Sequence, residues 1–324
     1  MRLSLLDRSR TRAGFSESAA LNHSVQRAVT AEKLGYARFW AAEHHAVPGI
    51  ASGSPAVLLA AAGAHTSHIR LGSGGVMLPH HQPLVVAEQF LMLEALYPGR
   101  IDLGLGRTLG FTKPVRRALR QTTEDVESYE HDVAELMSYL DRSAPVTARP
   151  ITDEAPHLFL LATGQGLKTA AAQGMPVVIG GPILKDPEVS AALAAYRRDF
   201  KPSAAAAEPS VTISMDVYIA GTEEEARELA LPEVYAMARA RETGEFGPLE
   251  PVAQIRQHSW SAQTQRRVDK GLSRAVAGTR AAVRSRLEQL VDSTGAAELM
   301  VSTSTYDRQA LTDLDAEVAH VVLG

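Results

Sequence analysis

Two adjacent histidines, His44 and His45, come directly after an apolar segment near the start of the chain. Histidine exchanges a proton near neutral pH, so a pair at the end of a buried strand is a candidate for acid–base catalysis. Neighbouring residues on a strand point to opposite sides, so only one of the two is expected to face a given site. A purely structural histidine is the alternative, and the residue types alone leave both interpretations open.

A pair of glycines and a glycine-flanked arginine end the next two apolar segments. Gly74 and Gly75 end the first, and Arg107 follows Gly104 and Gly106 at the end of the second. Because glycine has no Cβ, a flat ligand can approach the backbone closely at such positions. An arginine beside them suits an anionic group such as a phosphate. A tight strand–helix turn and an ordinary solvated arginine are the alternative interpretations.

A further candidate for phosphate binding lies where Thr163 and Gly164 precede a short predicted helix. Backbone N–H groups at the start of a helix bind anions, because they have no partner within the helix. Gly180 and Gly181 end the next apolar segment in a similar manner. If these segments are parallel strands of one sheet, all of these features converge at its carboxyl edge.

The sequence gives little support for other kinds of catalytic site. His44, His45, His80 and His81 suggest a metal site, but strand alternation lets few of them converge, and no carboxylate cluster with ligand spacing accompanies them. We therefore expect no metal. No Gly-x-Ser-x-Gly motif indicates a serine hydrolase. The absence of cysteine excludes disulfides, thiolate zinc sites and a cysteine nucleophile.

The elements that must position these residues alternate between strands and helices. Short apolar segments predict eight strands, at 2–6, 36–43, 69–76, 100–106, 158–162, 176–179, 210–220 and 299–302. Helices are predicted at 16–34, 55–65, 83–96, 124–140, 167–173, 187–200, 223–241, 279–293 and the C-terminus.

Such alternation implies parallel strands joined by right-handed crossovers. Eight units favour one α/β domain over residues 1–324, a (β/α)8 TIM barrel with its site at the carboxyl ends of the strands. No Gly-x-Gly-x-x-Gly motif opens the first helix, which argues against a dinucleotide-binding fold. Residues 241–278 are predicted to form an irregular excursion, either a surface loop or a mobile cover over the site.

The composition is that of an ordinary globular protein, with 45% hydrophobic and 22% charged residues among 324. The net charge of −4 gives no electrostatic basis for binding nucleic acid or an anionic membrane. The N-terminus lacks the pattern of a signal peptide, and no apolar segment approaches a membrane span in length. We therefore expect a cytoplasmic protein without nucleic-acid or membrane partners.

The stretch from residue 69 to residue 107 resembles the flavin-dependent luciferase-like monooxygenases nearly residue for residue, and the likeness includes Ala-Glu-His-His at 42–45. The resemblance implies a luciferase-like TIM barrel that takes reduced FMN from a separate flavin reductase. It implies reaction with O2 through a C4a-peroxyflavin and oxygenation of a small organic substrate. A deazaflavin-dependent dehydrogenase of the same superfamily and a flavin-binding protein without turnover are the alternatives.

The resemblance also implies roles for the histidines and the glycine pair. His44 is implied to lie near the reactive face of the flavin as a general acid–base. His45 is implied to lie at a subunit interface, where it can pair with Glu88. The Gly74–Gly75 peptide bond is implied to be cis, beneath the flavin ring.

The flavin phosphate has its own implied set of residues. Arg107 and the neighbouring Gly106 are implied to hold it, with Thr163 and Gly164 completing the site. Ala162 stands where many relatives carry the first of two serines, so one hydroxyl of that pair remains.

The predicted helices at 55–65 and 83–96 are apolar over more than one face. An outer helix of a barrel normally buries only its inner face. The surplus predicts a two-fold homodimer through these two helices, as the resembling enzymes form.

Overall fold

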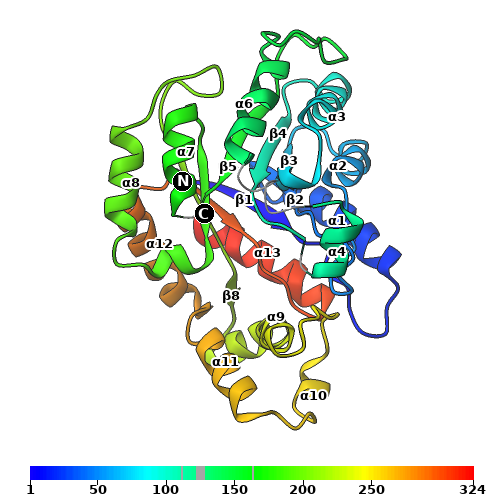
Figure 1. Ribbon diagram of the computed structural model, residues 1–324. Coiled ribbons are helices and arrows are strands. Elements are labelled where there is room, and N and C mark those ends of the chain that lie inside the picture. The colour runs from blue at the N-terminus through cyan, green and yellow to red at the C-terminus, as the bar shows by residue number, and fades with distance from the viewer. Residues whose placement is uncertain (111, 122–127, 163) are drawn as a thin grey trace.

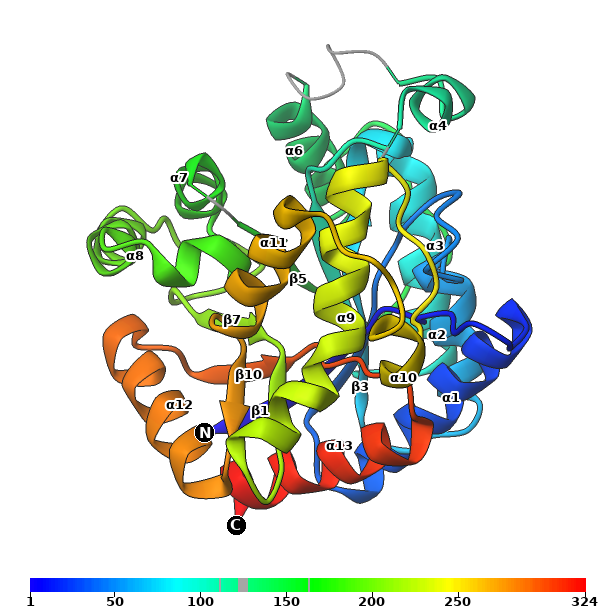
Figure 2. The same cartoon turned by 90° about the horizontal axis from the view of Figure 1, so that it is seen from below.

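The computed structural model describes residues 1–110, 112–121, 128–162 and 164–324. Its eight barrel strands are parallel and close in the order β1-β10-β7-β6-β5-β4-β3-β2, with helices around them (Figures 1 and 2). The strands of the barrel are β1 (Arg2–Asp7), β2 (Arg38–Ala41), β3 (Arg70–Met77), β4 (Ile101–Gly106), β5 (His157–Leu161), β6 (Val177–Gly180), β7 (Val211–Met215) and β10 (Glu298–Val301). The predicted (β/α)8 barrel is confirmed.

Helices follow most of the strands, as the alternating pattern predicts. The longer helices are α1 (Glu17–Lys33), α2 (Pro55–Gly63), α3 (Pro83–Leu96), α6 (Tyr129–Leu140), α7 (Gln165–Gln173), α8 (Val189–Arg198), α9 (Glu223–Thr243), α11 (Ala262–Leu272), α12 (Arg280–Thr294) and α13 (Arg308–Leu323). The shorter ones are η1 (Leu78–His80), α4 (Lys113–Ala118), η2 (Gly181–Lys185) and α10 (Val252–Ile255). None of the described helices is both long and apolar enough to cross a membrane.

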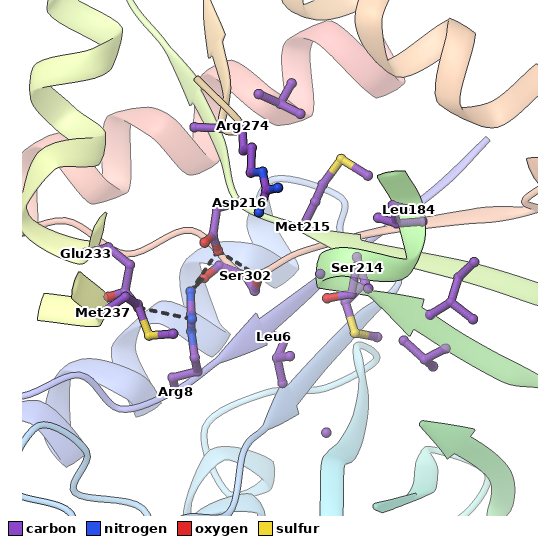
Figure 3. Close-up of a pocket in the computed structure, with 18 of the residues that line it drawn as sticks. Leu6, Arg8, Leu184, Ser214, Met215, Asp216, Glu233, Met237, Arg274 and Ser302 are labelled. Atoms are coloured by element: carbon purple, nitrogen blue, oxygen red, sulfur yellow. Dashed lines mark hydrogen bonds and ion pairs between the residues drawn. The ribbon is translucent and has the colours of Figure 1, made fainter. Parts of the chain in front are cut away.

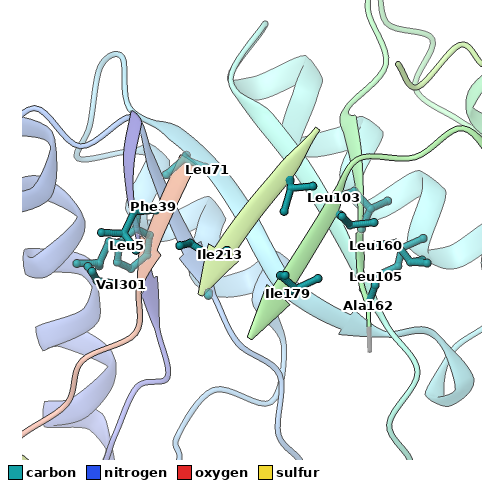
Figure 4. Close-up of a cluster of buried hydrophobic side chains, with 14 of the residues drawn as sticks. Leu5, Phe39, Leu71, Leu103, Leu105, Leu160, Ala162, Ile179, Ile213 and Val301 are labelled. Carbon is teal, nitrogen blue, oxygen red and sulfur yellow. The ribbon is translucent and has the colours of Figure 1, made fainter. Parts of the chain in front are cut away.

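Strand alternation divides the core into two parts. Side chains on the outer faces of the strands, such as Leu5, Phe39 and Ile213, are fully buried in one large cluster with the inner faces of the helices (Figure 4). Inward-facing side chains form a separate cluster around Trp40 and Phe159, whose rings meet edge to face at 5.1 Å. Because side chains alternate along a strand, Phe39 and its neighbour Trp40 belong to different parts of the core.

A charged layer closes the amino-terminal end of the barrel interior. It consists of Ser4, Arg38, Asp102 and Glu298, which we call the basal layer. Arg38 contacts Asp102 Oδ2 at 2.6 Å through Nη1 and Glu298 Oε1 at 2.9 Å through Nε. Ser4 Oγ donates to the same Glu298 oxygen at 2.5 Å. These charges are buried, so each depends on its partner for compensation.

Trp40 lies next to this layer and explains two of the strand glycines. Its Nε1 donates to Asp102 Oδ2 at 3.0 Å. A Cβ on Gly72 would lie 2.2 Å from Trp40 Nε1, and one on Gly104 would lie 3.0 Å from Trp40 Cζ3 and 2.2 Å from the Ser73 carbonyl oxygen. At these positions glycine makes room for the protein's own tryptophan.

The segment 210–220, predicted as one strand, forms two. β7 lies in the barrel, whereas β8 (Val217–Ile219) leaves it and pairs with β9 (Val276–Gly278) in a separate sheet. Asp216 lies between the two strands and accepts hydrogen bonds from Ser302 Oγ at 2.8 Å and Arg8 Nη2 at 2.7 Å. The prediction failed because apolar residues continue through both halves without a glycine or proline at the break.

The segment 241–278 is more regular than predicted. It contains the end of α9, the helices α10 and α11, and β9. α11 packs beside α9 (Figure 2), and both contribute to a small core with Tyr235, Ile255 and Val268. α11 was not predicted, because the residues on its outer face are strongly polar. α4 was also not predicted, and the first residues of the predicted helix 124–140 lie outside the described part of the chain.

Candidate functional site

A cavity of about 650 Å³ opens at the carboxyl end of the barrel, a size typical of small-molecule sites. The ends of several strands line it, together with α9 and α11 on one side. Of the features predicted to converge here, Gly74, Gly106, Arg107, Gly180 and Gly181 belong to its lining. The structure therefore brings the ends of β3 and β4 together at one cavity, as expected for a TIM barrel.

Glycines shape the floor of this cavity. A Cβ on Gly74 would lie 2.3 Å from Leu6 Cδ1, and one on Gly106 would lie 2.7 Å from Met77 Cε. A Cβ on Gly75 would instead meet the Gly104 carbonyl oxygen at 2.7 Å, inside the sheet. The Gly74–Gly75 peptide bond is cis, as the resemblance implies. Gly75 is thus needed for packing between strands, whereas Gly74 and Gly106 also expose backbone to the cavity.

Arg107 stands at the rim, directly after β4, and its side chain is exposed. Its guanidinium lies 5.9 Å from the ring centre of Tyr129 on α6. The Tyr129 hydroxyl is buried and has no hydrogen-bond partner among the described residues. The ring of Tyr129 thus lies near this cation, and an arginine and a tyrosine hydroxyl are both groups that can donate hydrogen bonds to a phosphate oxygen.

The predicted contribution of the fifth strand is described only in part. Thr163 lies outside the described residues. Gly164 has a left-handed φ of 48° and precedes α7, and no described residue apart from its chain neighbours lies within 4 Å of the position where its Cβ would be. Gly164 is not among the residues that line the cavity. The helix start nevertheless faces open space, as a binding role for its N–H groups would require.

His44 lies beyond the end of β2 and outside the cavity lining. Its backbone N–H donates to the Ser52 carbonyl at 2.9 Å, while its side-chain Nδ1 is buried and has no partner among the described residues. Burial, and next the positive charge of Arg8, lower the pKa of His44 to about 4. His44 is therefore neutral at pH 7, so it can accept a proton but is not in the imidazolium form that would act as an acid.

The other histidines converge more closely than we predicted. Glu43 Oε1 lies 2.7 Å from His45 Nε2, 3.3 Å from His80 Nδ1 and 2.9 Å from His81 Nε2. We call these four residues the histidine cluster; their ligand atoms all lie within 4.8 Å of one another, a grouping compatible with a metal. The argument from strand alternation was wrong because these residues lie after strand ends, in turns and in η1, where alternation does not apply.

The cluster also satisfies its buried carboxylate without a metal. Glu43 Oε2 accepts the Met77 N–H at 3.2 Å. Burial favours the neutral acid, but the hydrogen bonds from His45, His80 and His81 outweigh it and hold the pKa of Glu43 well below its usual range. The cluster therefore contains an ionised glutamate surrounded by imidazoles.

The implied pairing of His45 with Glu88 is not found within the chain. His45 contacts Glu43, as described, and Glu88 Oε1 accepts the backbone N–H of Arg149 at 3.1 Å. Glu88 lies on α3, which begins after the turn that carries the other two histidines. Within the chain His45 thus pairs with Glu43, and a pairing with Glu88 across a subunit interface stays a prediction.

Sequence reasoning missed a group of charged residues in the cavity. Arg8 Nη2 contacts Asp216 Oδ1 at 2.7 Å and Arg8 Nη1 contacts Glu233 Oε1 at 3.1 Å (Figure 3). Glu233 also contacts Arg10 Nε at 2.8 Å. Burial favours neutral Glu233, but Arg10 and Arg8 hold its pKa below the usual range, whereas burial raises the pKa of Asp216. Of these charged residues, only Arg8 could have been suggested by the sequence, because it directly follows the first strand.

Comparison with known proteins gives consistent results. The family model of luciferase-like monooxygenases matches residues 1–298. A protein of Escherichia coli (strain K12) described as a luciferase-like monooxygenase is 39% identical over 312 residues, which cover 95% of this chain and 92% of that protein. The crystal structure of apo-MsnO8 has a TM-score of 0.87 at 31% identity and covers 99% of this chain and 97% of that one.

A further relative matches about half of the chain. An N-acetyl-S-alkylcysteine monooxygenase of Bacillus subtilis (strain 168) is 43% identical over 169 residues, 50% of this chain and 51% of that protein.

Proposed function

Because the chain belongs to the luciferase-like monooxygenase family, we propose that it uses reduced FMN and O2 to oxygenate a small organic substrate. One observation carries the choice of site: the carboxyl end of the barrel holds a cavity of about 650 Å³ with Gly74 and Gly106 at its floor and Arg107 at its rim. A flat ring suits the bare floor, and a phosphate suits the arginine.

The residues present fit FMN. Arg107 would bind the phosphate, with the Tyr129 hydroxyl and the N–H groups at the start of α7 as further donors. Leu6, Leu161 and Val178 give the cavity an apolar surface for the ring and for part of the substrate. When bound, reduced FMN would supply the electrons that activate O2 for transfer of one oxygen atom; the protein binds, orients and excludes water.

In this proposal His44 accepts a proton during turnover. The lowered pKa of His44 keeps its imidazole neutral at pH 7. The buried Nδ1 atom of His44 forms no hydrogen bond with the described residues, so neither a lone pair nor a proton at this atom is engaged. Arg8, which lines the cavity, is the charged group that acts most strongly on His44. His44→Gln should leave FMN affinity nearly unchanged and slow oxygenation roughly a hundredfold, the range for loss of a general base. Unchanged turnover would make His44 a packing residue.

The proposed partners are a flavin reductase and a second copy of the chain. α2 and α3 expose Val57 (71%), Val85 (46%), Met92 (56%) and Leu96 (62%), which is unusual for the outer face of barrel helices. A two-fold dimer would cover them. Light scattering at micromolar concentration should give the dimer mass, and Met92→Glu should shift it to the monomer. A monomeric wild type would remove this part of the proposal.

The proposal is tested by comparing cofactors. The protein should bind reduced FMN more tightly than a reduced deazaflavin cofactor. After mixing with O2, the absorbance of oxidised flavin should return more slowly than for free reduced FMN. Tight binding of the deazaflavin alone would support a dehydrogenase. FMN binding with reoxidation at the rate of free flavin would support a binding protein without turnover.

A further inference from the structure

The cavity is strongly cationic in a protein whose net charge is −4. Its lining contains two carboxylates, Asp216 and Glu233. It contains eight basic residues, which are Arg8, Arg107, Lys185, Arg241, Arg267, Lys270, Arg274 and Arg286. Both carboxylates form ion pairs with Arg8, so they are already engaged, and the basic residues of the lining outnumber them.

Six of these basic residues form one side of the cavity, which we call the cation wall. Its members come from η2, from α9 and α11, from the loop after α11 and from α12, and they are Lys185, Arg241, Arg267, Lys270, Arg274 and Arg286. In barrel order these elements accompany β6, β7 and β10, whereas Arg107 follows β4. The cation wall is thus separate from the residue proposed to hold the flavin phosphate.

The charges of the cation wall have no counterpart in the described part of the chain. Among the described residues, no member of the wall forms an ion pair, and Arg267 Nη1 is buried without a hydrogen-bond partner. Lys185 Nζ donates to the Arg274 carbonyl oxygen at 2.6 Å. Burial, and next the charges of Arg274 and Arg286, lower the pKa of Lys185 to about 8. Like charges are held close together here, an arrangement that a bound anion would stabilise.

The rest of the cavity beside the wall is apolar. Arg274 extends into the same region as Met215 and Leu184, and Leu6 lies at the floor (Figure 3). A ligand with an apolar body and one anionic end would therefore match both surfaces. Planar guanidinium groups favour a carboxylate or sulfonate, which accepts two parallel hydrogen bonds.

We propose that the cation wall is the substrate's binding site and that the substrate carries an anionic group, a carboxylate or sulfonate, attached to an apolar chain. The anionic group binds Arg267 and Arg274, with Lys185, Lys270 and Arg286 adding long-range attraction. The apolar chain lies toward Leu6 and Met215, where it is presented to the cofactor. That this ligand is the substrate rests on the proposed function, whereas the binding of an anion at the cation wall does not.

The test uses hexanoate and hexanamide as matched probes that differ in charge and little in shape. Their binding is measured by titration calorimetry with the full-length protein, both flavin-free and saturated with FMN. Wild type should bind hexanoate at least tenfold more tightly than hexanamide, and this preference should weaken as salt is added. Preference for hexanoate in the flavin-free protein, with no FMN binding, would support the anion site and refute the proposed function.

The variants are Arg267→Gln and Arg274→Gln, with Arg266→Gln as the matched control. Arg266 neighbours Arg267 on α11 but is not part of the cavity lining. Each test variant should lose at least fivefold in hexanoate affinity and change little for hexanamide or FMN, while the control binds like wild type. Arg274→Lys should retain part of the affinity, and circular dichroism checks folding of each variant.

Three results would overturn the proposal. The first is equal affinity of wild type for the two probes, or no binding of hexanoate. The second is an equal loss in Arg266→Gln and Arg267→Gln, which would indicate only a general electrostatic effect. The third is a loss of FMN affinity with hexanoate affinity retained, which would assign the cation wall to the cofactor.

Discussion

The two ends of the barrel interior differ in how their charged residues are paired. In the basal layer, buried Arg38 lies between Asp102 and Glu298, and each charge has a close partner. At the mouth, the basic residues of the cation wall are mostly exposed and form no ion pairs among the described residues. Paired buried charges specify the packing of a fold, whereas unpaired charges around a cavity are available to a ligand. The same residue types thus have different functions at the two ends.

The largest effect is expected in the basal layer. Asp102→Ala removes one of the two carboxylates that bind Arg38, and it leaves Trp40 Nε1 without its acceptor. The free energy of unfolding should fall by about 3–5 kcal/mol, the usual range for breaking a buried ion pair. Urea unfolding followed by tryptophan fluorescence measures it. Asp292→Ala, on the exposed side of α12, is the control and should change stability by less than about 0.5 kcal/mol. A loss below about 1 kcal/mol in Asp102→Ala would contradict the assignment of the basal layer to stability.

A smaller effect on stability is expected from a change of pH, and it tests the environment of His44 near the carboxyl end of the barrel. Burial, followed by the positive charges of Arg8 and Arg10, lowers the pKa of His44 from an ordinary 6.5 to about 4, while the negative charge of Glu43 acts in the opposite direction. As pH falls below 6.5 the unfolded chain binds a proton that the folded chain refuses until about pH 4. His44 therefore makes stability decrease as pH falls through this window.

The comparison that isolates this effect uses asparagine variants. His44→Asn should flatten the decrease in unfolding free energy between pH 6.5 and 4, measured by urea titrations at several pH values. His65→Asn, at an exposed position, should leave the slope unchanged. An unaltered slope in His44→Asn would mean that His44 is solvated and easily protonated, contrary to its burial.

The smallest effect is expected on metal removal. Because Glu43 is already satisfied by three imidazoles and the Met77 N–H, exhaustive dialysis against EDTA should shift the melting temperature by less than about 1 °C, which corresponds to under about 1 kcal/mol for a chain of this length. Differential scanning calorimetry measures the shift. A clear rise in melting temperature with Zn2+, abolished in His81→Ala, would show that the histidine cluster binds metal.

The barrel was predictable because its signals are local. Strand segments such as 100–106 and the helix at 83–96 have unbroken apolar patterns, and the prediction matches α3 at both ends. Gly74 and Arg107 were predictable since they lie in or directly after the carboxyl halves of β3 and β4, whose carboxyl ends meet in any TIM barrel. The break of the segment 210–220 at Asp216 was not predictable, because the residues on both sides of Asp216 follow the pattern of one continuous strand.

Residues that act through tertiary contacts gave no local signal. Glu233 lies within a long helix, and only folding brings it to Arg8 and Arg10. The histidine cluster was misjudged because the relevant residues lie in turns, where strand periodicity does not hold. Likewise, no spacing in the sequence indicates that Arg274 and Lys185 come together.

The central claim is that the mouth of the barrel binds FMN with its phosphate on Arg107. Riboflavin lacks this phosphate, so the most direct measurement is the affinity of wild type and Arg107→Gln for FMN and for riboflavin, with Arg117→Gln as an exposed control. We expect Arg107→Gln to weaken FMN binding by about 1.5–3 kcal/mol, the value of a charge-assisted hydrogen bond, and to leave riboflavin binding unchanged. Equal losses for both flavins, or no loss for FMN, would contradict the account and place the phosphate elsewhere.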